Sequence, residues 1–205
     1  MSGQWKDYMR KLQTVLQETN YVRPNDIPNI DLYMDQVTKF MDEHLESSRR
    51  FEGDKLLTKT MINNYTKNDL LPPPEKKRYS KDHMYLLVFI YYLKNFLSIR
   101  DVKEIIGPMS QMFFDGNDEI SLEEIYNNIF QIEQEQSYEF AKDVMRKFIK
   151  SKKTFKEVQR DEERDYLQTF SFIAMLSFDV YLKKNLIESI IDDVLADEPE
   201  ASKYE

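Results

Sequence analysis

Apolar side chains recur at intervals of three and four residues along most of the chain, which is the spacing of one face of an α-helix. The first such stretch, Trp5–Glu18, predicts an amphipathic helix. A loop containing Pro24 and Pro28 follows, and a second helix then presents an apolar stripe from Tyr33 to Leu45. Asn29 or Asp31 can cap this second helix.

The middle of the chain alternates short helices with proline-rich and polar turns. Thr58 or Thr60 can cap a short helix that ends near Lys67. Pro72-Pro73-Pro74 cannot continue a helix, so it predicts an extended segment, which stays basic as far as Tyr79. Ser80 can cap the next helix, which is apolar on nearly every side up to Leu97 and is therefore expected to be buried.

Capping signals also mark the helices of the second half. Ser98-Ile99-Arg100-Asp101 is close to a capping box and starts a short helix that we expect to stop at Gly107-Pro108. Asp115–Asp118 has the composition of a turn. Ser121-Leu122-Glu123-Glu124 starts a long helix, and an interruption near Gln134–Ser137 is left open.

The last predicted helix follows a basic turn at residues 150–154 and is apolar nearly all round from Phe170 to Leu182. Phe170, Phe172, Phe178 and Tyr181 are consistent with three arrangements: a ligand pocket, a core or a dimer seam. A helix that is apolar on all sides must be covered on all sides. We therefore expect a homodimer formed through the helices between Leu122 and Leu195.

Composition narrows the class of protein. Hydrophobic residues make up 41% of the 205 residues, which is enough for a core. The chain has no cysteine, which excludes a disulfide framework and cysteine-ligated zinc. Its two histidines leave few residues for a Ser-His-Asp triad, and its four glycines form no phosphate-binding loop. His44 and His83 are expected on helix surfaces rather than as metal ligands. No apolar run reaches the roughly 20 residues of a membrane span. We therefore expect a cytoplasmic protein that is not an enzyme, with no metal or cofactor and no membrane partner.

Charge is unevenly distributed along the sequence. Residues 49–103 carry 12 basic and 6 acidic side chains, a net charge of +6, whereas the whole chain has a net charge of −8. The remainder is therefore at −14. Such asymmetry indicates a basic binding module within an acidic protein, or a chance fluctuation on a solvated surface.

The order of features between Leu57 and Ile106 resembles the DNA-binding domain of the MerR regulators, a winged helix-turn-helix. Met61–Tyr65 stands where that family has its recognition helix, and Leu70-Leu71-Pro72 corresponds to the turn that follows. Lys77–Ser80 corresponds to the exit of the wing, and Leu97-Ser98-Ile99 to the last turn between helices. The resemblance implies a regulator that binds double-stranded DNA.

The chain is also similar to an uncharacterised bacterial family with a domain of unknown function, mainly from Gram-positive species. The strings that carry this similarity are Asp31–Val37, Leu57–Tyr65 and Leu93–Ile99. The similarity extends from about Ile30 to Ile106.

These observations predict an all-α chain with a minimal wing. Its expected parts are an N-terminal helix and loop (1–30), a winged helix-turn-helix (31–107), a linker (108–120), a helical dimerisation region (121–196) and an acidic tail (197–205). We expect a chain ended after Gly107 to remain folded, because its core can close on Tyr85–Leu97.

The candidate DNA contacts come from the resemblance and from side-chain chemistry. Asn63 and Asn64 occupy the place where MerR proteins carry an Arg-Tyr pair, and asparagine can pair with the major-groove edge of adenine. The basic side chains around them can contact phosphates. The full set is Lys59, Asn63, Asn64, Lys67, Lys76, Lys77 and Arg78.

An alternative without DNA contacts stays open for these residues. Asn63 and Asn64 would be exposed polar residues or local caps of a surface helix, and the basic residues Lys76, Lys77 and Arg78 would belong to a solubilising loop. In that case the chain is a protein-interaction module that keeps the fold without binding DNA. The operator, the regulated genes and any small-molecule effector cannot be deduced from the sequence.

Overall fold

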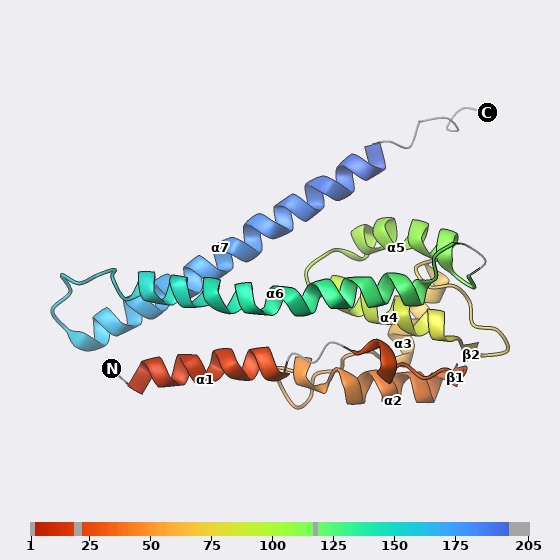
Figure 1. The fold of residues 1–205 in the computed structure, drawn as a ribbon, viewed down its shortest axis with the longest axis horizontal. Helices are drawn as coiled ribbons and strands as arrows, with labels where there is room; N and C mark the ends of the chain where they lie inside the picture. The colour runs from red at the N-terminus through yellow and green to blue at the C-terminus, as the bar shows by residue number, and fades with distance from the viewer. Residues whose placement is uncertain (1–2, 19–21, 117–118, 197–205) are drawn as a thin grey trace. The chain divides into compact units, whose positions relative to one another are not determined.

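The computed structural model describes residues 3–18, 22–116 and 119–196. Within them the chain forms α-helices, two single 3-10 turns and one two-stranded sheet (Figure 1). The elements in chain order are α1 (Gly3–Glu18), η1 (Pro24–Asp26), β1 (Leu32–Tyr33), α2 (Met34–His44), η2 (Glu46–Ser48), α3 (Lys59–Lys67), β2 (Arg78–Tyr79), α4 (Lys81–Leu93), α5 (Ile99–Phe113), α6 (Leu122–Ser151) and α7 (Asp161–Ala196). The predicted predominance of helix is confirmed.

The chain divides into two compact units, which we describe separately. Unit 1 is Met1–Glu133 and unit 2 is Gln134–Glu205. The division falls inside α6, which is one continuous helix from Leu122 to Ser151. The interruption left open near Gln134–Ser137 is therefore absent from the backbone.

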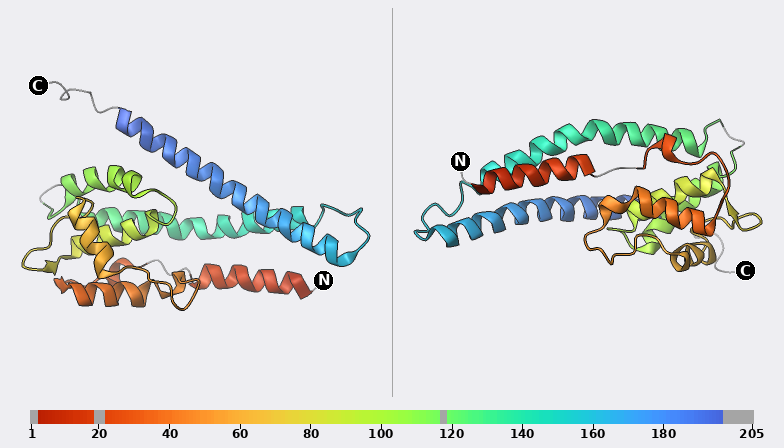
Figure 2. Two further views of the ribbon diagram at one scale, coloured as in Figure 1. Left: turned by 180° about the vertical axis from the view of Figure 1, so that it is seen from behind. Right: turned by 90° about the horizontal axis from the view of Figure 1, so that it is seen from below.

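Helix α4 forms the centre of unit 1. Its residues Tyr85, Leu86, Leu87, Val88 and Ile90 have no exposed surface. It packs against α5 and β2, while α2 packs against α3 and the sheet. Figure 2 shows α3 crossing α2 at a steep angle. The burial of α4, expected from its uniformly apolar surface, is confirmed.

Local capping signals were read correctly at three helices. Thr58 Oγ1 accepts a hydrogen bond from the Met61 amide (3.2 Å) at the start of α3. The Ser98 hydroxyl accepts one from the Asp101 amide (3.1 Å) at the start of α5. The Ser121 hydroxyl does the same for the Glu124 amide (3.2 Å) at the start of α6. Each bond satisfies an amide that has no partner within the helix.

Helix α2 begins later than the sequence suggested. Its N-cap is Tyr33, whose amide donates to Gln36 Oε1 (2.8 Å), so neither Asn29 nor Asp31 caps it. The reason is a strand that the sequence pattern did not reveal. Leu32 and Tyr33 form β1, which pairs antiparallel with β2 in the register Leu32↔Tyr79 and Tyr33↔Arg78.

Helix α5 does not stop at Gly107-Pro108; the expected end was wrong. It continues to Phe113 with Pro108 inside it, although an interior proline removes one backbone hydrogen bond and costs about 3 kcal/mol. The residues just after the helix contact α4. The Phe114 ring lies edge-on to His83, with centroids 4.7 Å apart, and the Asp115 amide donates to Asp82 Oδ2 (3.0 Å).

The first turns of α6 complete the core of unit 1. Leu122 is fully buried and Tyr126 is 4% exposed. The Tyr126 hydroxyl donates to the Val22 carbonyl (2.5 Å), and its ring lies 4.9 Å from that of Tyr85 and 5.3 Å from that of Phe89. The compact unit therefore extends well beyond Gly107.

Unit 2 is a pair of helices joined by a loop. Phe148 of α6 packs edge-on to Phe172 of α7, with centroids 5.5 Å apart. Buried Gln168 donates to the Thr154 carbonyl (3.0 Å) and so fixes the loop against α7. No helix among the described residues is long and apolar enough to cross a membrane.

Candidate nucleic-acid interface

Helix α3 has one buried face and one exposed polar face. Ile62 is fully buried and Tyr65 is 6% exposed, and together they hold the helix against unit 1. Asn63, Asn64 and Lys67 are exposed on its outer side. The C-cap is Asn68, whose side chain donates to the Asn64 carbonyl (2.8 Å). The two asparagines are thus mid-helix surface residues rather than caps.

The basic segment after the prolines ends in a tight turn rather than an extended strand. The Arg78 amide donates to the Glu75 carbonyl (2.8 Å), and the two central residues, Lys76 and Lys77, have φ angles of 47° and 65°. Two successive positive φ angles are typical of a type I′ hairpin turn, where Asn-Gly is favoured. A left-handed conformation costs a lysine roughly 1–2 kcal/mol. The expectation of an extended chain through these lysines was wrong.

Tyr33 connects β2, which follows the turn at Lys76 and Lys77, to the start of α2. Its strand partner is Arg78, whose guanidinium lies 5.3 Å from the centre of the Tyr33 ring. Arg78 Nε also donates to the Tyr33 hydroxyl (3.3 Å). Tyr33 is half exposed, so this stacked pair faces solvent. The sequence pattern had assigned Tyr33 to the apolar stripe of a helix.

The N-terminus of α3 meets the same part of α2. Lys59 forms an exposed ion pair with Asp35, which is two residues after Tyr33. The structure therefore brings Lys59 and Arg78 to one short segment, residues 33–35. Asn63, Asn64 and Lys67 continue from Lys59 along α3. Lys76 and Lys77 are exposed at the tip of the hairpin.

His83 contacts both ends of the segment from Pro72 to Ser80 and is buried, with 3% of its surface exposed. Its Nδ1 accepts a hydrogen bond from the Ser80 amide (3.0 Å), and its Nε2 lies 3.2 Å from the Pro72 carbonyl, to which a neutral ring protonated on Nε2 donates. Burial lowers the pKa of His83 below its ordinary value of 6.5. The expected surface position was wrong for this histidine, because the fold closes Pro72 and Tyr79 over the first turn of α4.

His44, in contrast, is only half buried. It stacks on Phe40 with ring centroids 4.0 Å apart, and its Nδ1 lies 2.9 Å from the Phe40 carbonyl. No group of three or more His, Cys, Asp or Glu side chains in the described part of the chain is placed to hold a metal ion.

Comparison with known families matches the part of the chain that carries this interface. The profile of a family described as a domain of unknown function, DUF1836, matches residues 22–130. The chain belongs to this family. No curated protein and no solved structure matches it. The prediction of an uncharacterised family is confirmed, whereas the likeness to MerR regulators stays a prediction.

The DUF1836 region extends further than the similarity read from the sequence, which ended near Ile106. It runs from Val22, which bonds to Tyr126, to Phe130 in α6. The family region thus includes both the candidate interface residues and the α6 residues that complete the core of unit 1.

Proposed function

We propose that this protein binds double-stranded DNA as a winged helix-turn-helix and acts as a transcriptional regulator. The element order β1, α2, α3, the turn at Lys76-Lys77, β2, α4 and α5 supports the MerR-like prediction. In this arrangement β1 pairs with β2, the strand that follows the turn. The observation that carries the proposal is the hairpin tip. Two exposed lysines occupy left-handed positions that suit Asn-Gly better, beside a helix with an exposed polar face.

The hairpin tip supplies contacts that position the DNA. Lys76 and Lys77 are exposed charges at the tip of the turn, and Arg78 donates a hydrogen bond to the Tyr33 hydroxyl. Contacts of this kind go to phosphates and carry no sequence information. They make affinity depend steeply on salt, because each neutralised phosphate releases counterions.

Helix α3 supplies the reading of bases. An α-helix fits the major groove, and the amide of Asn63 or Asn64 has the donor and acceptor needed to pair with adenine. Both residues are exposed, and neither is a cap of α3, whose caps are Thr58 and Asn68. Lys59 and Lys67, near the two ends of the helix, reach towards the flanking phosphates.

Asp35 moderates this interface. It pairs with Lys59 in the protein alone, so binding DNA through Lys59 requires that exposed ion pair to open. An exposed pair contributes only about 0–1 kcal/mol, and a phosphate competes for the same lysine. We therefore assign the larger share of the electrostatic attraction to DNA to Lys76, Lys77 and Arg78.

The first test removes the charge of the hairpin tip. We expect Lys76→Ala/Lys77→Ala/Arg78→Ala to weaken binding to all duplexes alike and to lower the slope of log affinity against log salt by about three. Lys76→Asn/Lys77→Gly removes two charges while favouring the turn, so it should lower the slope by about two without loss of folding. Fluorescence anisotropy over a salt series measures both slopes.

A matched control removes three exposed lysines of unit 2, Lys150, Lys153 and Lys156. It changes the net charge of the protein equally and should leave the salt slope unchanged. Wild-type slopes in both tip variants would contradict the proposal and favour the protein-interaction alternative.

The second test concerns base reading. Replacing Asn63 or Asn64 with Ala should cost about 1–3 kcal/mol on a preferred site and little on random DNA, because a lost base contact does not affect phosphate binding. Selection of bound fragments from a random duplex pool identifies the site first. An equal loss on preferred and random duplexes would show that α3 does not read bases.

A further inference from the structure

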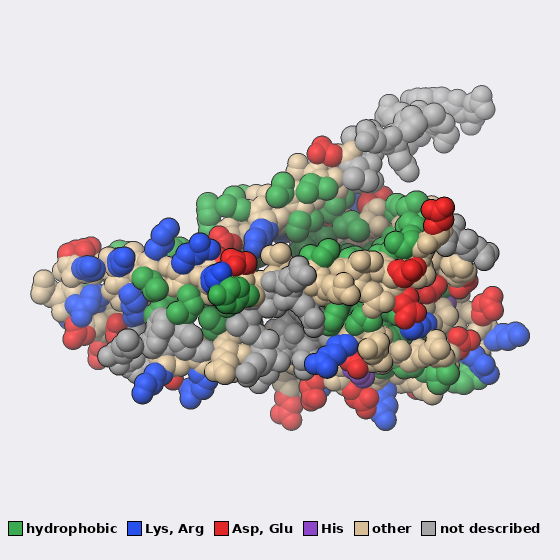
Figure 3. Space-filling view, in the orientation of Figure 1, with side chains coloured by type: hydrophobic (Ala, Val, Ile, Leu, Met, Phe, Trp, Pro, Cys, Tyr) green, Lys and Arg blue, Asp and Glu red, His purple; other side chains and the backbone are tan. Residues whose placement is uncertain are grey.

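The loop that joins α6 to α7 carries a concentrated positive charge. Residues 150–160 contain five basic side chains and one acidic side chain, a net charge of +4 in a chain whose net charge is −8. Lys153 and Lys156 are exposed within this loop. Figure 3 shows Lys and Arg side chains gathered at this end of unit 2.

The neighbouring basic side chains are accounted for within the unit. Lys152 and Arg160 each form an ion pair with a carboxylate at the start of α7. Lys150 lies in the last turn of α6, where the helix dipole favours a positive charge. Lys153 and Lys156 lie beyond that turn, and no ion pair joins either of them to a side chain in the described parts of the chain. Their charge therefore faces solvent or a partner.

Hydrogen bonds from α7 hold this loop in one conformation. Buried Gln168 donates to the carbonyls of Lys152 (3.3 Å) and Thr154 (3.0 Å). Arg164 donates to the carbonyl of Val158 (3.0 Å). A partner that binds an ordered loop loses less conformational entropy than one that must order it.

Phe155 lies between the two exposed lysines and has a left-handed backbone. Its φ angle is 52°, and 37% of its surface is exposed. Glycine and asparagine adopt this conformation more readily than phenylalanine does. The Val158 amide donates to the Phe155 carbonyl (3.2 Å) and so closes the turn. Backbone strain of this kind persists only where surrounding contacts enforce it, and it clusters at ligand-binding positions.

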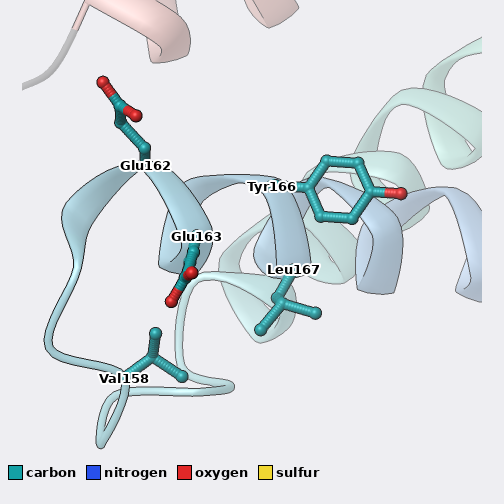
Figure 4. A pocket seen from close by; sticks show the side chains of 5 residues that line it. All are labelled: Val158, Glu162, Glu163, Tyr166 and Leu167. Atoms are coloured by element: carbon teal, nitrogen blue, oxygen red, sulfur yellow. The ribbon is translucent and has the colours of Figure 1, made fainter.

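A hollow of about 470 Å³ lies beside this turn. Val158 of the loop and Leu167 of α7 face each other across it, so it suits one apolar side chain (Figure 4). Two glutamates of α7 also line the hollow, and Arg160 neutralises one of them, Glu163. The other is Glu162, which gives this side of the hollow a negative charge.

We propose that this end of unit 2 binds an acidic segment of another protein that carries one large apolar side chain. The apolar side chain enters the hollow between Val158 and Leu167. Carboxylates that flank it in the partner contact Lys153 and Lys156, and the Phe155 ring supplies apolar surface beside them. We call these five residues the loop site.

The two signs of charge around the hollow favour a protein segment over other anions. A nucleic acid carries a phosphate at every nucleotide, so it would bring negative charge against Glu162 as well as against the lysines. A protein segment can place its carboxylates on the lysine side alone, and complementary charge then fixes its orientation. The inference does not depend on DNA binding by unit 1.

Selection from a random peptide library displayed on phage, with the full-length protein as the target, tests the proposal. We expect the enriched peptides to combine acidic residues with one leucine, isoleucine or phenylalanine. The most enriched peptide is then synthesised with a fluorescent label, and its affinity is measured by anisotropy. Replacing its apolar residue with alanine should weaken binding by about tenfold or more. Enrichment of basic peptides, or no enrichment, would overturn the proposal.

Two pairs of lysines provide a reciprocal comparison. Lys153→Ser/Lys156→Ser should weaken binding of the peptide by about tenfold or more and leave DNA affinity unchanged. Lys76→Asn/Lys77→Gly should leave peptide affinity unchanged, although it removes the same number of charges. Equal loss of peptide affinity in both variants would show unspecific attraction and would refute the loop site. The DNA measurement bears only on the proposed function, so failure of one proposal is distinguishable from failure of the other.

Two further variants test the apolar contacts. Leu167→Ser should weaken peptide binding because it removes one wall of the hollow. Phe155→Asn removes the ring but suits the left-handed backbone, so it should weaken peptide binding while the thermal midpoint is kept or raised. Wild-type peptide affinity in both variants would overturn the proposal.

A labelled single-stranded thymidine oligonucleotide tests the competing occupant. We expect it to bind the wild-type protein and Lys153→Ser/Lys156→Ser with the same affinity. Oligonucleotide binding that is lost in this variant would assign the loop site to nucleic acid and overturn the proposal.

Discussion

A chain ended after Gly107 is expected to lose most of the stability of unit 1, whereas a chain ended after Glu133 is expected to unfold cooperatively. The shorter chain lacks Leu122 and Tyr126, both of which are buried in the core. Removing a buried leucine costs about 2–5 kcal/mol, and removing a buried aromatic ring costs about 3–5 kcal/mol. Domains have only about 5–15 kcal/mol in total. The deletion therefore removes a large part of the stability.

Urea unfolding followed by circular dichroism compares the two chains. The sequence alone predicts that the chain ending at Gly107 folds, whereas the buried contacts of α6 lead us to expect that it is much less stable. Tyr126→Ala in the full chain provides a matched point variant, which removes one ring and its bond to Val22 without shortening the chain. Equal stability of the two truncated chains would show that α6 adds nothing to unit 1.

Acidification below about pH 6.5 is expected to weaken unit 1 through His83. The pKa of this histidine is lowered in the folded protein, chiefly by burial, so the unfolded chain takes up the proton first. The stabilisation is therefore complete above pH 6.5 and is lost as the pH falls from 6.5 towards the folded-state pKa. One proton changes the free energy of unfolding by at most about 1.4 kcal/mol per pH unit.

Other charged groups lie near His83, so their contribution to the pH dependence must be separated by comparing the wild-type protein with a variant. Asp115 and Asp31 attract the proton, and burial raises the pKa of the neighbouring Asp82 above its ordinary value. His83→Gln retains a capping side chain but does not titrate, so its unfolding free energy should be flatter between pH 5 and 6.5. Identical slopes in the wild-type and His83→Gln proteins would show that His83 is not responsible.

Signals that act within one turn of helix were predictable from the sequence. Thr58, Ser98 and Ser121 start their helices because each bonds to an amide three residues ahead. The exposure of Asn63 and Asn64 also followed, because Ile62 and Tyr65 define the buried face of the same short helix. These features depend on spacing alone.

Features that depend on distant partners were missed. β1 has only two residues, and nothing in Leu32-Tyr33 identifies a strand until Arg78 and Tyr79 lie beside it. The burial of His83 likewise requires Pro72 to fold back over α4. Of the candidate site, single residues could be chosen from sequence, but the Arg78–Tyr33 stack could not.

The left-handed turn at Lys76-Lys77 places folding and charge in direct competition during evolution. Selection for thermal stability alone would replace these lysines with Asn-Gly, which relaxes the backbone without touching the core. Under the proposed function, a lineage that keeps basic residues there retains a less stable hairpin because its charge contacts DNA. The proposal therefore predicts that related chains with Asn-Gly at these two positions bind DNA more weakly than those with a lysine or arginine pair.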